Sequence, residues 1–204
     1  LSAEGVAFRQ LAHRPGVGFA DVFADLADAT SLVQTCSQVT SVFHCAGYAH
    51  AFSTFSEEDS AKHWAVNFEG TRNLVEAAGR VGVRSFIFLS SVKAMAEPGD
   101  LCVDESYSGN PETPYGQSKL AAEQAVLEAG RRYGMHVVNL RLAMVYGSGG
   151  RGNLERMGRL VKRRLFPPLP ETGNHRSMVH VDDVVSAMRL VASDGRANGQ
   201  TYIV

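Results

Sequence analysis

The feature that most constrains the fold is a regular alternation of short apolar runs and longer helical patterns along the chain. The clearest run is "SFIFLS" at residues 85–90, whose continuous apolar character is typical of a strand buried on both faces. Apolar residues recur at helical spacing on either side of it, at 60–80 and 114–133. Because strands that alternate with helices form βαβ units, we expect an α/β fold with a doubly wound parallel sheet.

The expected elements fill a single domain of 204 residues. Asp28 or Thr30 is expected to cap the first helix, and Asp182 or Asp183 the last. The strands are expected at residues 6–12, 21–24, 41–45, 85–90, 135–142 and 201–204. The helices are expected at residues 30–37, 60–80, 114–133, 153–164 and 181–192.

Charge and cysteine content exclude several classes of partner. The chain has 20 basic and 21 acidic residues, a net charge of −1, so neither nucleic acid nor an anionic membrane is expected as a partner. No stretch reaches the ~18 apolar residues of a membrane span. Cys36, Cys45 and Cys102 are far apart, without the spacing of a metal site or a disulfide framework. We therefore expect no metal and a reduced, cytoplasmic location.

Tyr115 and Lys119 are four residues apart, so they share one face of the predicted helix. A tyrosine has an ordinary pKa of ~10, and a nearby ammonium favours its phenolate form. The pair is therefore suited to moving a proton beside a hydride carrier. The alternative is that both residues lie on the exposed face of an amphipathic helix.

Ser91 follows the buried strand and lies 24 residues before Tyr115. Its hydroxyl could hydrogen-bond a substrate oxygen and orient Tyr115, although capping of the strand end is an alternative. Ligands of doubly wound sheets bind beyond the carboxyl ends of the strands. Asp25, Ala46-Gly47 and the segment after Leu142 also follow predicted strands, which supports a site there. His44, inside an apolar strand, is interpreted as a core residue.

Taken in order, these motifs resemble the extended short-chain dehydrogenase/reductase family, specifically its NAD-dependent epimerase/dehydratase branch. The resemblance covers nearly the whole chain. It is carried by "DLAD" (25–28), "VFHCAGYAH" (42–50), "NFEGTRNLVEAA" (67–78), "FIFLSS" (86–91), "PYGQSK" (114–119), "LRLAMVYGSGG" (140–150) and "RSMVHVDDVVSAM" (176–188).

The resemblance implies a catalytic set and a cofactor site. Ser91, Tyr115 and Lys119 match the catalytic residues, with Lys119 lowering the pKa of Tyr115 and holding the nicotinamide ribose. NAD is the implied cofactor. The implied cofactor contacts are Asp25, Leu26, Cys45, Ala46, Gly47, Asn67, Tyr115, Lys119 and Met144. Asn67 could instead be a buried polar residue bonded to the backbone.

The resemblance also implies a nucleotide-sugar substrate held partly by residues 147–180. Asn153 and Leu154 match a diphosphate-binding pair, and Arg176 matches an arginine that pairs with the same group. A guanidinium binds phosphate bidentately, and a helix N-terminus directs N–H groups at an anion. The alternatives are a helix cap for Asn153 and a solvent-facing charge for Arg176. Ser91 would also contact the sugar.

Two departures from the family pattern concern the cofactor and the chain ends. The family's G-x-x-G-x-x-G turn is missing near residue 1, and a C-terminal substrate lobe is missing after residue 204. We therefore expect a domain truncated at both ends. NAD-preferring members usually carry an acid at the end of the second strand, where this chain has Ala12, His13 and Arg14. NADP is therefore an alternative cofactor.

The implied activity is that of a UDP-hexose 4-epimerase, with transient hydride removal and Tyr115 as proton shuttle. Dehydratases of the family carry an Asp-Glu pair after the catalytic hydroxyl, where this chain has Val92-Lys93, which argues against dehydration. The alternatives are an NADPH-dependent reductase and, in another class, a non-catalytic dinucleotide-binding sensor. A homodimer through the helices at 60–80 and 114–133 is also implied.

Overall fold

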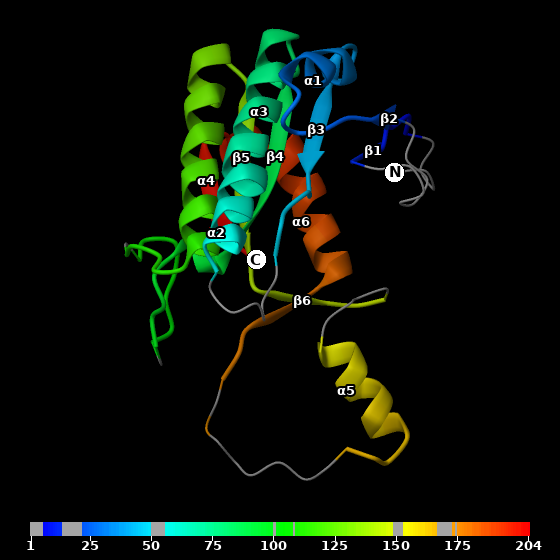
Figure 1. Cartoon of the computed structure of the whole chain (residues 1–204), viewed down its shortest axis with the longest axis vertical. Helices are drawn as coiled ribbons and strands as arrows, with labels where there is room; N and C mark the ends of the chain where they lie inside the picture. Colours follow the sequence, from blue (N-terminus) through cyan, green and yellow to red (C-terminus); the bar gives the residue numbers. More distant parts are fainter. Residues whose placement is uncertain are drawn as a thin grey trace.

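The computed structural model describes residues 6–13, 22–49, 56–99, 101–107, 109–148, 153–166, 173 and 175–204, without the side chains of 153–156. Its centre is a parallel sheet of four strands in the order β3, β4, β5 and β8 (Figure 1). These strands are β3 (Ser41–His44), β4 (Ser85–Ser91), β5 (His136–Leu142) and β8 (Gln200–Ile203). The α/β fold expected from the sequence is confirmed.

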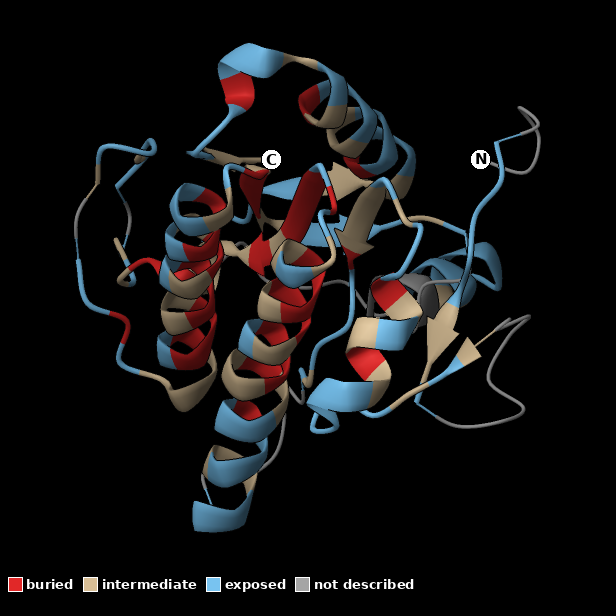
Figure 2. Ribbon diagram, turned by 90° about the horizontal axis from the view of Figure 1, so that it is seen from above, coloured by how far each residue is buried: buried red, intermediate tan, exposed pale blue. Residues whose placement is uncertain are grey.

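Side chains of β4 alternate between two apolar layers, as a strand buried on both faces requires. Phe86 and Phe88 pack in the core formed with helices α1, α3 and α4, whereas Ile87 packs with Val191 of α6. Figure 2 shows the buried residues in the sheet and on the inward sides of these helices. Helices therefore cover both faces, which confirms the doubly wound arrangement. They are α1 (Ala29–Cys36), α3 (Gly70–Arg80), α4 (Pro114–Tyr133) and α6 (Val181–Ser193).

Local capping fixes where α4 begins and ends. The Thr113 hydroxyl accepts a hydrogen bond from the Gly116 N–H at 3.1 Å, and Pro114 occupies the first turn. Gly134 ends the helix with a φ of 64°, in the left-handed region that glycine adopts most readily. In the same way, the Asp28 carboxylate caps α1. These ends determine the position of Tyr115 on the first turn of α4.

The predicted cap of α6 is wrong. The helix begins at Val181, and His180 is its N-cap, with Nδ1 accepting a hydrogen bond from the Asp182 N–H at 3.3 Å. Asp182 and Asp183 lie in the first turn instead. Their carboxylates are favourable there because the helix N-terminus carries partial positive charge.

The helix predicted at 60–80 is longer and consists of three segments. It begins at α2 (Glu57–His63), where Ser56 is the cap, continues as a π-helix, η2 (Trp64–Glu69), and ends as α3. A π-helix adds a residue to the turn and therefore changes which side chains face the core. Asn67, within η2, is buried with 1% exposure.

The remaining differences lie outside the central sheet. The strand predicted at residues 6–12 is wrong for 6–10, because only β1 (Leu11–Ala12) pairs, in parallel, with β2 (Val22–Phe23). A parallel pair of β6 (Met144–Tyr146) and β7 (Met178–His180) was not predicted. The other short elements are η3 (Val92–Ala94), α5 (Asn153–Lys162) and η4 (Gly195–Ala197). In the described part of the chain, none of the helices is both long and apolar enough for a membrane span.

Candidate active site

The structure brings the three predicted catalytic residues together at the carboxyl end of the central sheet. Ser91 ends β4, Tyr115 lies on the first turn of α4, and Lys119 follows one turn later. The Ser91 hydroxyl is close enough to Tyr115 to act on the pKa of its phenol. The Ser91 hydroxyl also accepts the Lys93 N–H at 3.2 Å, so the strand-end capping interpretation holds as well.

Tyr115 does not have the lowered pKa that the resemblance implies. Burial raises the pKa of this phenol above its ordinary value of 10.0, and the nearby Ser91 hydroxyl opposes the change only in part. The surrounding protein therefore favours the neutral phenol, because a phenolate is costly in a poorly solvated site. The causes that act on this pKa in the structure are burial and Ser91, so a lowering by Lys119 stays a prediction.

Lys119 is buried beside the site and does not lie on an exposed helix face. Its side chain is only 4% exposed, and its Nζ donates a hydrogen bond to the Leu89 carbonyl at 2.7 Å. The ammonium lies 4.1 Å from the centroid of the Phe88 ring, a favourable cation–π contact. Burial lowers the pKa of Lys119 from 10.5 to about 8, while the Glu123 carboxylate opposes that change.

The loop after β3 is held against Lys119 by Asn67. The Asn67 Oδ1 accepts the Tyr48 N–H at 2.7 Å, and its Nδ2 donates to the Tyr48 carbonyl at 3.0 Å. A Cβ added to Gly47 would lie 3.4 Å from the Asn67 Oδ1 and 4.0 Å from the Lys119 Nζ. Asn67 is thus a buried residue bonded to backbone, and it fixes the predicted cofactor loop of Cys45, Ala46 and Gly47.

A buried ion pair behind Lys119 was not predicted from the sequence. Glu123 is 2% exposed, and it accepts hydrogen bonds from Arg141 of β5 at 3.0 and 2.7 Å and from the Ser90 hydroxyl at 2.5 Å. The pair ties α4 to β4 and β5, and it places a negative charge one helical turn beyond Lys119. The spacing of Lys119 and Glu123 was the available signal, because residues four apart share a helix face.

The predicted adenine-side residues lie after β2. The Asp25 Oδ1 accepts the Ala27 N–H at 2.9 Å, and its Oδ2 lies 3.9 Å from the His13 Nδ1. Both of these side chains are exposed. The Leu26 carbonyl accepts a hydrogen bond from the Asn73 Nδ2 at 2.9 Å. The segment is therefore anchored through Leu26, while the polar groups of Asp25 and His13 face solvent.

The remaining predicted site residues, Met144 for the cofactor and Asn153, Leu154 and Arg176 for the substrate, lie after β5 in the chain. Met144 lies in β6 and is 45% exposed, and Arg176 is exposed two residues before β7. Asn153 and Leu154 begin α5, but their side chains lie outside the described part of the chain. Figure 1 shows β6 and α5 beyond the lower edge of the central sheet. Their roles remain predictions.

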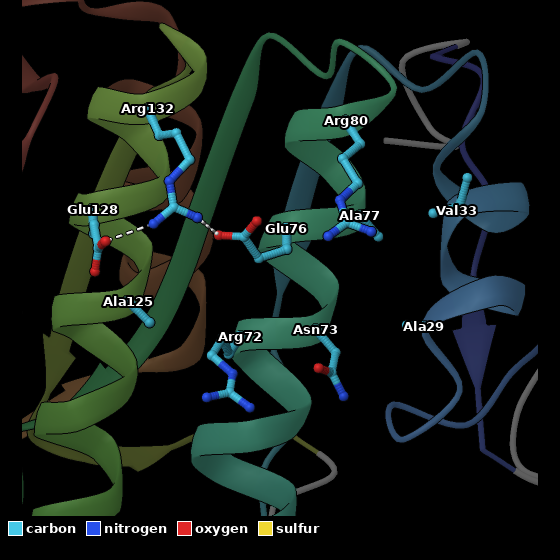
Figure 3. Close-up of a pocket in the computed structure, with 10 residues that line it drawn as sticks. All are labelled: Ala29, Val33, Arg72, Asn73, Glu76, Ala77, Arg80, Ala125, Glu128 and Arg132. Carbon is cyan, nitrogen blue, oxygen red and sulfur yellow. Dashed lines mark hydrogen bonds and ion pairs between the residues drawn. The ribbon is translucent and has the colours of Figure 1, made fainter.

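A separate hollow of ≈ 320 Å³ lies on the outer side of α1, α3 and α4 (Figure 3). Charged residues of α3 and α4 line it, and Arg132 bridges Glu76 and Glu128. None of the predicted site residues lines this hollow. Among the described residues, no cluster of His, Cys, Asp and Glu has the makings of a metal site.

Gly116 determines how closely the first turn of α4 approaches the segment after Ser91. A Cβ at this position would overlap the Lys93 carbonyl oxygen and lie 2.8 Å from the Pro111 Cβ. We expect Gly116→Ala to shift Tyr115 from Ser91, to cost about 1–3 kcal/mol of unfolding free energy and to lower kcat about tenfold or more. Urea unfolding and steady-state kinetics check both effects.

Gly158→Ala is the matched control, because a Cβ there meets no atom within 4 Å. It is expected to leave kcat unchanged and to stabilise α5 slightly, since alanine favours helix over glycine. Equal kinetics for Gly116→Ala and the unsubstituted protein would show that this close approach does not position Tyr115.

Comparisons with known proteins identify the family. Residues 3–204 match the NAD dependent epimerase/dehydratase family. A UDP-glucose 4-epimerase from Vibrio cholerae is 33% identical over 186 residues, or 88% of this chain and 56% of that protein. A dTDP-glucose 4,6-dehydratase from Mycobacterium tuberculosis is 29% identical over 197 residues, or 90% of this chain and 56% of that protein.

The fold also matches solved structures. The structure of MoeE5 in complex with UDP-glucose and NAD has a TM-score of 0.85 at 26% identity, covering 100% of this chain and 69% of that one. The chain spans 56% of the length of the two curated relatives. The match over residues 3–204 shows that this chain belongs to the NAD dependent epimerase/dehydratase family.

Proposed function

We propose that the protein is an NAD-dependent epimerase of a nucleotide-diphosphate sugar, similar to a UDP-hexose 4-epimerase. The observation that carries this proposal is that Ser91 and Tyr115 lie close together beside the buried Lys119, at the carboxyl end of a parallel sheet. Such an edge is where doubly wound sheets bind dinucleotides. The related epimerase and the UDP-glucose and NAD complex support the same choice.

The residues present fit a nicotinamide dinucleotide. A side chain at Gly47 would fill the space between Asn67 and Lys119, so glycine leaves room for a cofactor to approach the backbone. Lys119 and the loop of Cys45, Ala46 and Gly47 would hold the nicotinamide half, and Asp25 with Leu26 the adenine half. When bound, the oxidised cofactor supplies a hydride acceptor and a positive charge.

In this proposal Tyr115 takes the proton of the sugar hydroxyl that is oxidised and returns it after the sugar has turned over. Ser91 orients that hydroxyl through a hydrogen bond from its own hydroxyl, which also lies near Tyr115. Because burial raises the pKa of Tyr115, positive charge nearby is needed to favour its phenolate. Lys119, buried next to the loop that would hold the cofactor, is the residue of this chain that supplies it.

Substrate binding would involve the segment at 147–180. Asn153 and Leu154 at the start of α5 and the exposed Arg176 are the proposed diphosphate contacts. A helix N-terminus and a guanidinium are both suited to that anion. The near-neutral composition and scattered cysteines support a cytoplasmic location without nucleic-acid or membrane partners.

The second candidate function is an NADPH-dependent reductase of a keto-sugar. It is favoured by His13, which directly follows β1, at the position where NAD-preferring members carry an acid. The His13 Nδ1 lies 3.9 Å from the Asp25 Oδ2. The test incubates the complete gene product with UDP-glucose and NAD, and separately with a UDP-4-keto-sugar and NADPH. Formation of UDP-galactose without net change in nicotinamide absorbance supports the epimerase. Stoichiometric oxidation of NADPH, with no epimer formed, overturns it.

A homodimer through α3 and α4 is also proposed. The outer sides of these helices carry Arg72, Arg80 and Arg132 with Glu76 and Glu128 around the hollow of Figure 3, so such an interface would be held partly by ion pairs. Sedimentation equilibrium at low and high salt distinguishes a monomer from a homodimer. A monomer mass at both salt concentrations would contradict the proposed dimer.

A further inference from the structure

His63 is a buried residue next to Tyr115, and the proposed mechanism gives His63 no role. It is the last residue of α2, four residues before Asn67, and it is 7% exposed. Its ring lies edge-on to two tyrosine rings. The centroid distances are 4.9 Å to Tyr48, at 62° between the planes, and 5.5 Å to Tyr115, at 64°. His63 therefore lies between the loop after β3 and Tyr115.

One hydrogen bond fixes the orientation of the imidazole. The His63 Nδ1 lies 3.1 Å from the Tyr48 carbonyl oxygen. A carbonyl oxygen only accepts, so this shorter contact assigns the proton to Nδ1, and the Asn67 Nδ2, which is also a donor, lies farther from Nδ1 at 3.4 Å. The Asn67 Nδ2 donates to the same oxygen at 3.0 Å. Two donors from one helical segment therefore hold the Tyr48 backbone.

The segment that carries His63 is itself anchored. The Tyr48 hydroxyl donates to the Asp59 Oδ1 at 2.9 Å, and the Ser56 hydroxyl donates to the Asp59 Oδ2 at 3.1 Å. Tyr48 thus joins the loop after β3 to helix α2 twice, through its backbone carbonyl and through its side-chain hydroxyl. The His63 imidazole therefore cannot turn without breaking its hydrogen bond to the Tyr48 carbonyl.

We propose that His63 is a positioning residue for Tyr115: its ring packs against the phenol ring and, through its bond to Tyr48, keeps Tyr115 aligned with the loop that would hold the cofactor. Edge-to-face aromatic pairs have preferred geometries and a measurable energy. Because the phenol oxygen must meet a substrate hydroxyl, a small tilt of the Tyr115 ring lowers the rate. The kinetic part of this proposal rests on the proposed epimerase function, whereas the packing part does not.

The two roles of His63 can be separated by two substitutions. His63→Phe keeps a ring against Tyr115 but removes the donor to Tyr48. His63→Asn places an amide donor near the position of Nδ1 but removes the ring. If the ring positions Tyr115, His63→Asn lowers kcat about threefold to tenfold, the factor expected for loss of one aromatic pair. His63→Phe stays within about twofold of the unsubstituted kcat.

A second readout does not depend on activity. The protein is labelled with 3-fluorotyrosine, and the ¹⁹F resonance of Tyr115 is assigned by its loss in Tyr115→Phe. Loss of the neighbouring ring in His63→Asn is expected to shift or broaden the Tyr115 resonance, while His63→Phe keeps it narrow. Trp64→Leu is the control, because Trp64 packs edge-on to Phe68 instead; it is expected to leave both the Tyr115 resonance and kcat unchanged.

The outcomes distinguish this proposal from the proposed function. An unchanged Tyr115 resonance in His63→Asn overturns the positioning role whatever the activity, as do equal losses of kcat in both His63 variants. A shifted resonance in a protein without epimerase activity supports the packing and rejects the epimerase. Should His63→Asn fail to fold, a shifted or broadened resonance in His63→Leu, with kcat lowered as expected for His63→Asn, supports the proposal; an unchanged resonance or kcat overturns it.

Discussion

Replacing Tyr115 with phenylalanine is expected to lower kcat for sugar epimerisation by about a hundredfold to ten-thousandfold, the usual contribution of a positioned proton-transfer group. The substitution removes the hydroxyl that lies near Ser91 and keeps the ring that packs edge-on to His63. The loop and Lys119 are expected to stay in place, so NAD affinity changes little. Product formation from UDP-glucose and a fluorescence titration with NADH measure the two effects.

Tyr133→Phe is the matched control on the same helix. Its hydroxyl donates to the Glu76 Oε2 at 2.8 Å, at the opposite end of α4 from Tyr115, so kcat is expected to remain within about twofold, because changes away from a site act mainly on stability. A Tyr115→Phe enzyme with full activity would remove Tyr115 from the proposed proton transfer. Equal losses in both variants would point to folding rather than chemistry.

Much of this site could be predicted because the signals that place it are local. The helix at 114–133 has local start and stop signals, with Thr113 as its cap, Pro114 in its first turn and Gly134 after its end, so the boundaries of α4 are those predicted. The apolar run that forms β4 likewise placed Ser91 at its end. The two elements that carry the proposed catalytic residues are each specified within about twenty residues of sequence, and the sheet then brings their ends together.

The parts that could not be predicted depend on contacts distant in the sequence or on departures from regular periodicity. The π-helix at Trp64–Glu69 interrupts a pattern that reads as one continuous α-helix, so the sequence did not show that His63 and Asn67 would meet the same carbonyl. Arg141 meets Glu123 across 18 positions of sequence. The pKa of Tyr115 depends on burial, which no local motif reveals.

The substrate half of the site shows the same limit. β6 and β7 are three residues each and pair across more than thirty positions, too short for alternating polarity to identify them as strands. Met144 and Arg176 were assigned from the resemblance, and the described residues show only that both are exposed. Their roles as cofactor and substrate contacts remain proposals that depend on the ligand-bound geometry.

Replacing Glu123 with glutamine is expected to have the largest effect on stability. The amide keeps the volume of the side chain but leaves the Arg141 guanidinium, 13% exposed, without a counter-charge. Removing one partner of a buried ion pair typically costs about 3–5 kcal/mol, because the other charge stays buried and uncompensated. Urea unfolding should therefore show a much lower midpoint, and Lys119 loses the carboxylate that raises its pKa.

Glu128→Gln separates burial from charge, because Glu128 lies on the same helix and pairs with Arg132 at 2.6 Å while 62% exposed. An exposed pair of this kind contributes about 1 kcal/mol or less. If Glu123→Gln and Glu128→Gln lower the unfolding free energy equally, the Glu123–Arg141 pair does not behave as the buried ion pair inferred from its geometry. The double variant Glu123→Leu/Arg141→Met provides the final test: with both charges gone, no desolvated charge remains, so much of the stability should return. Such recovery would show that the single variant is destabilised by an orphaned charge, and that the pair aligns α4 with β5 rather than providing net stability.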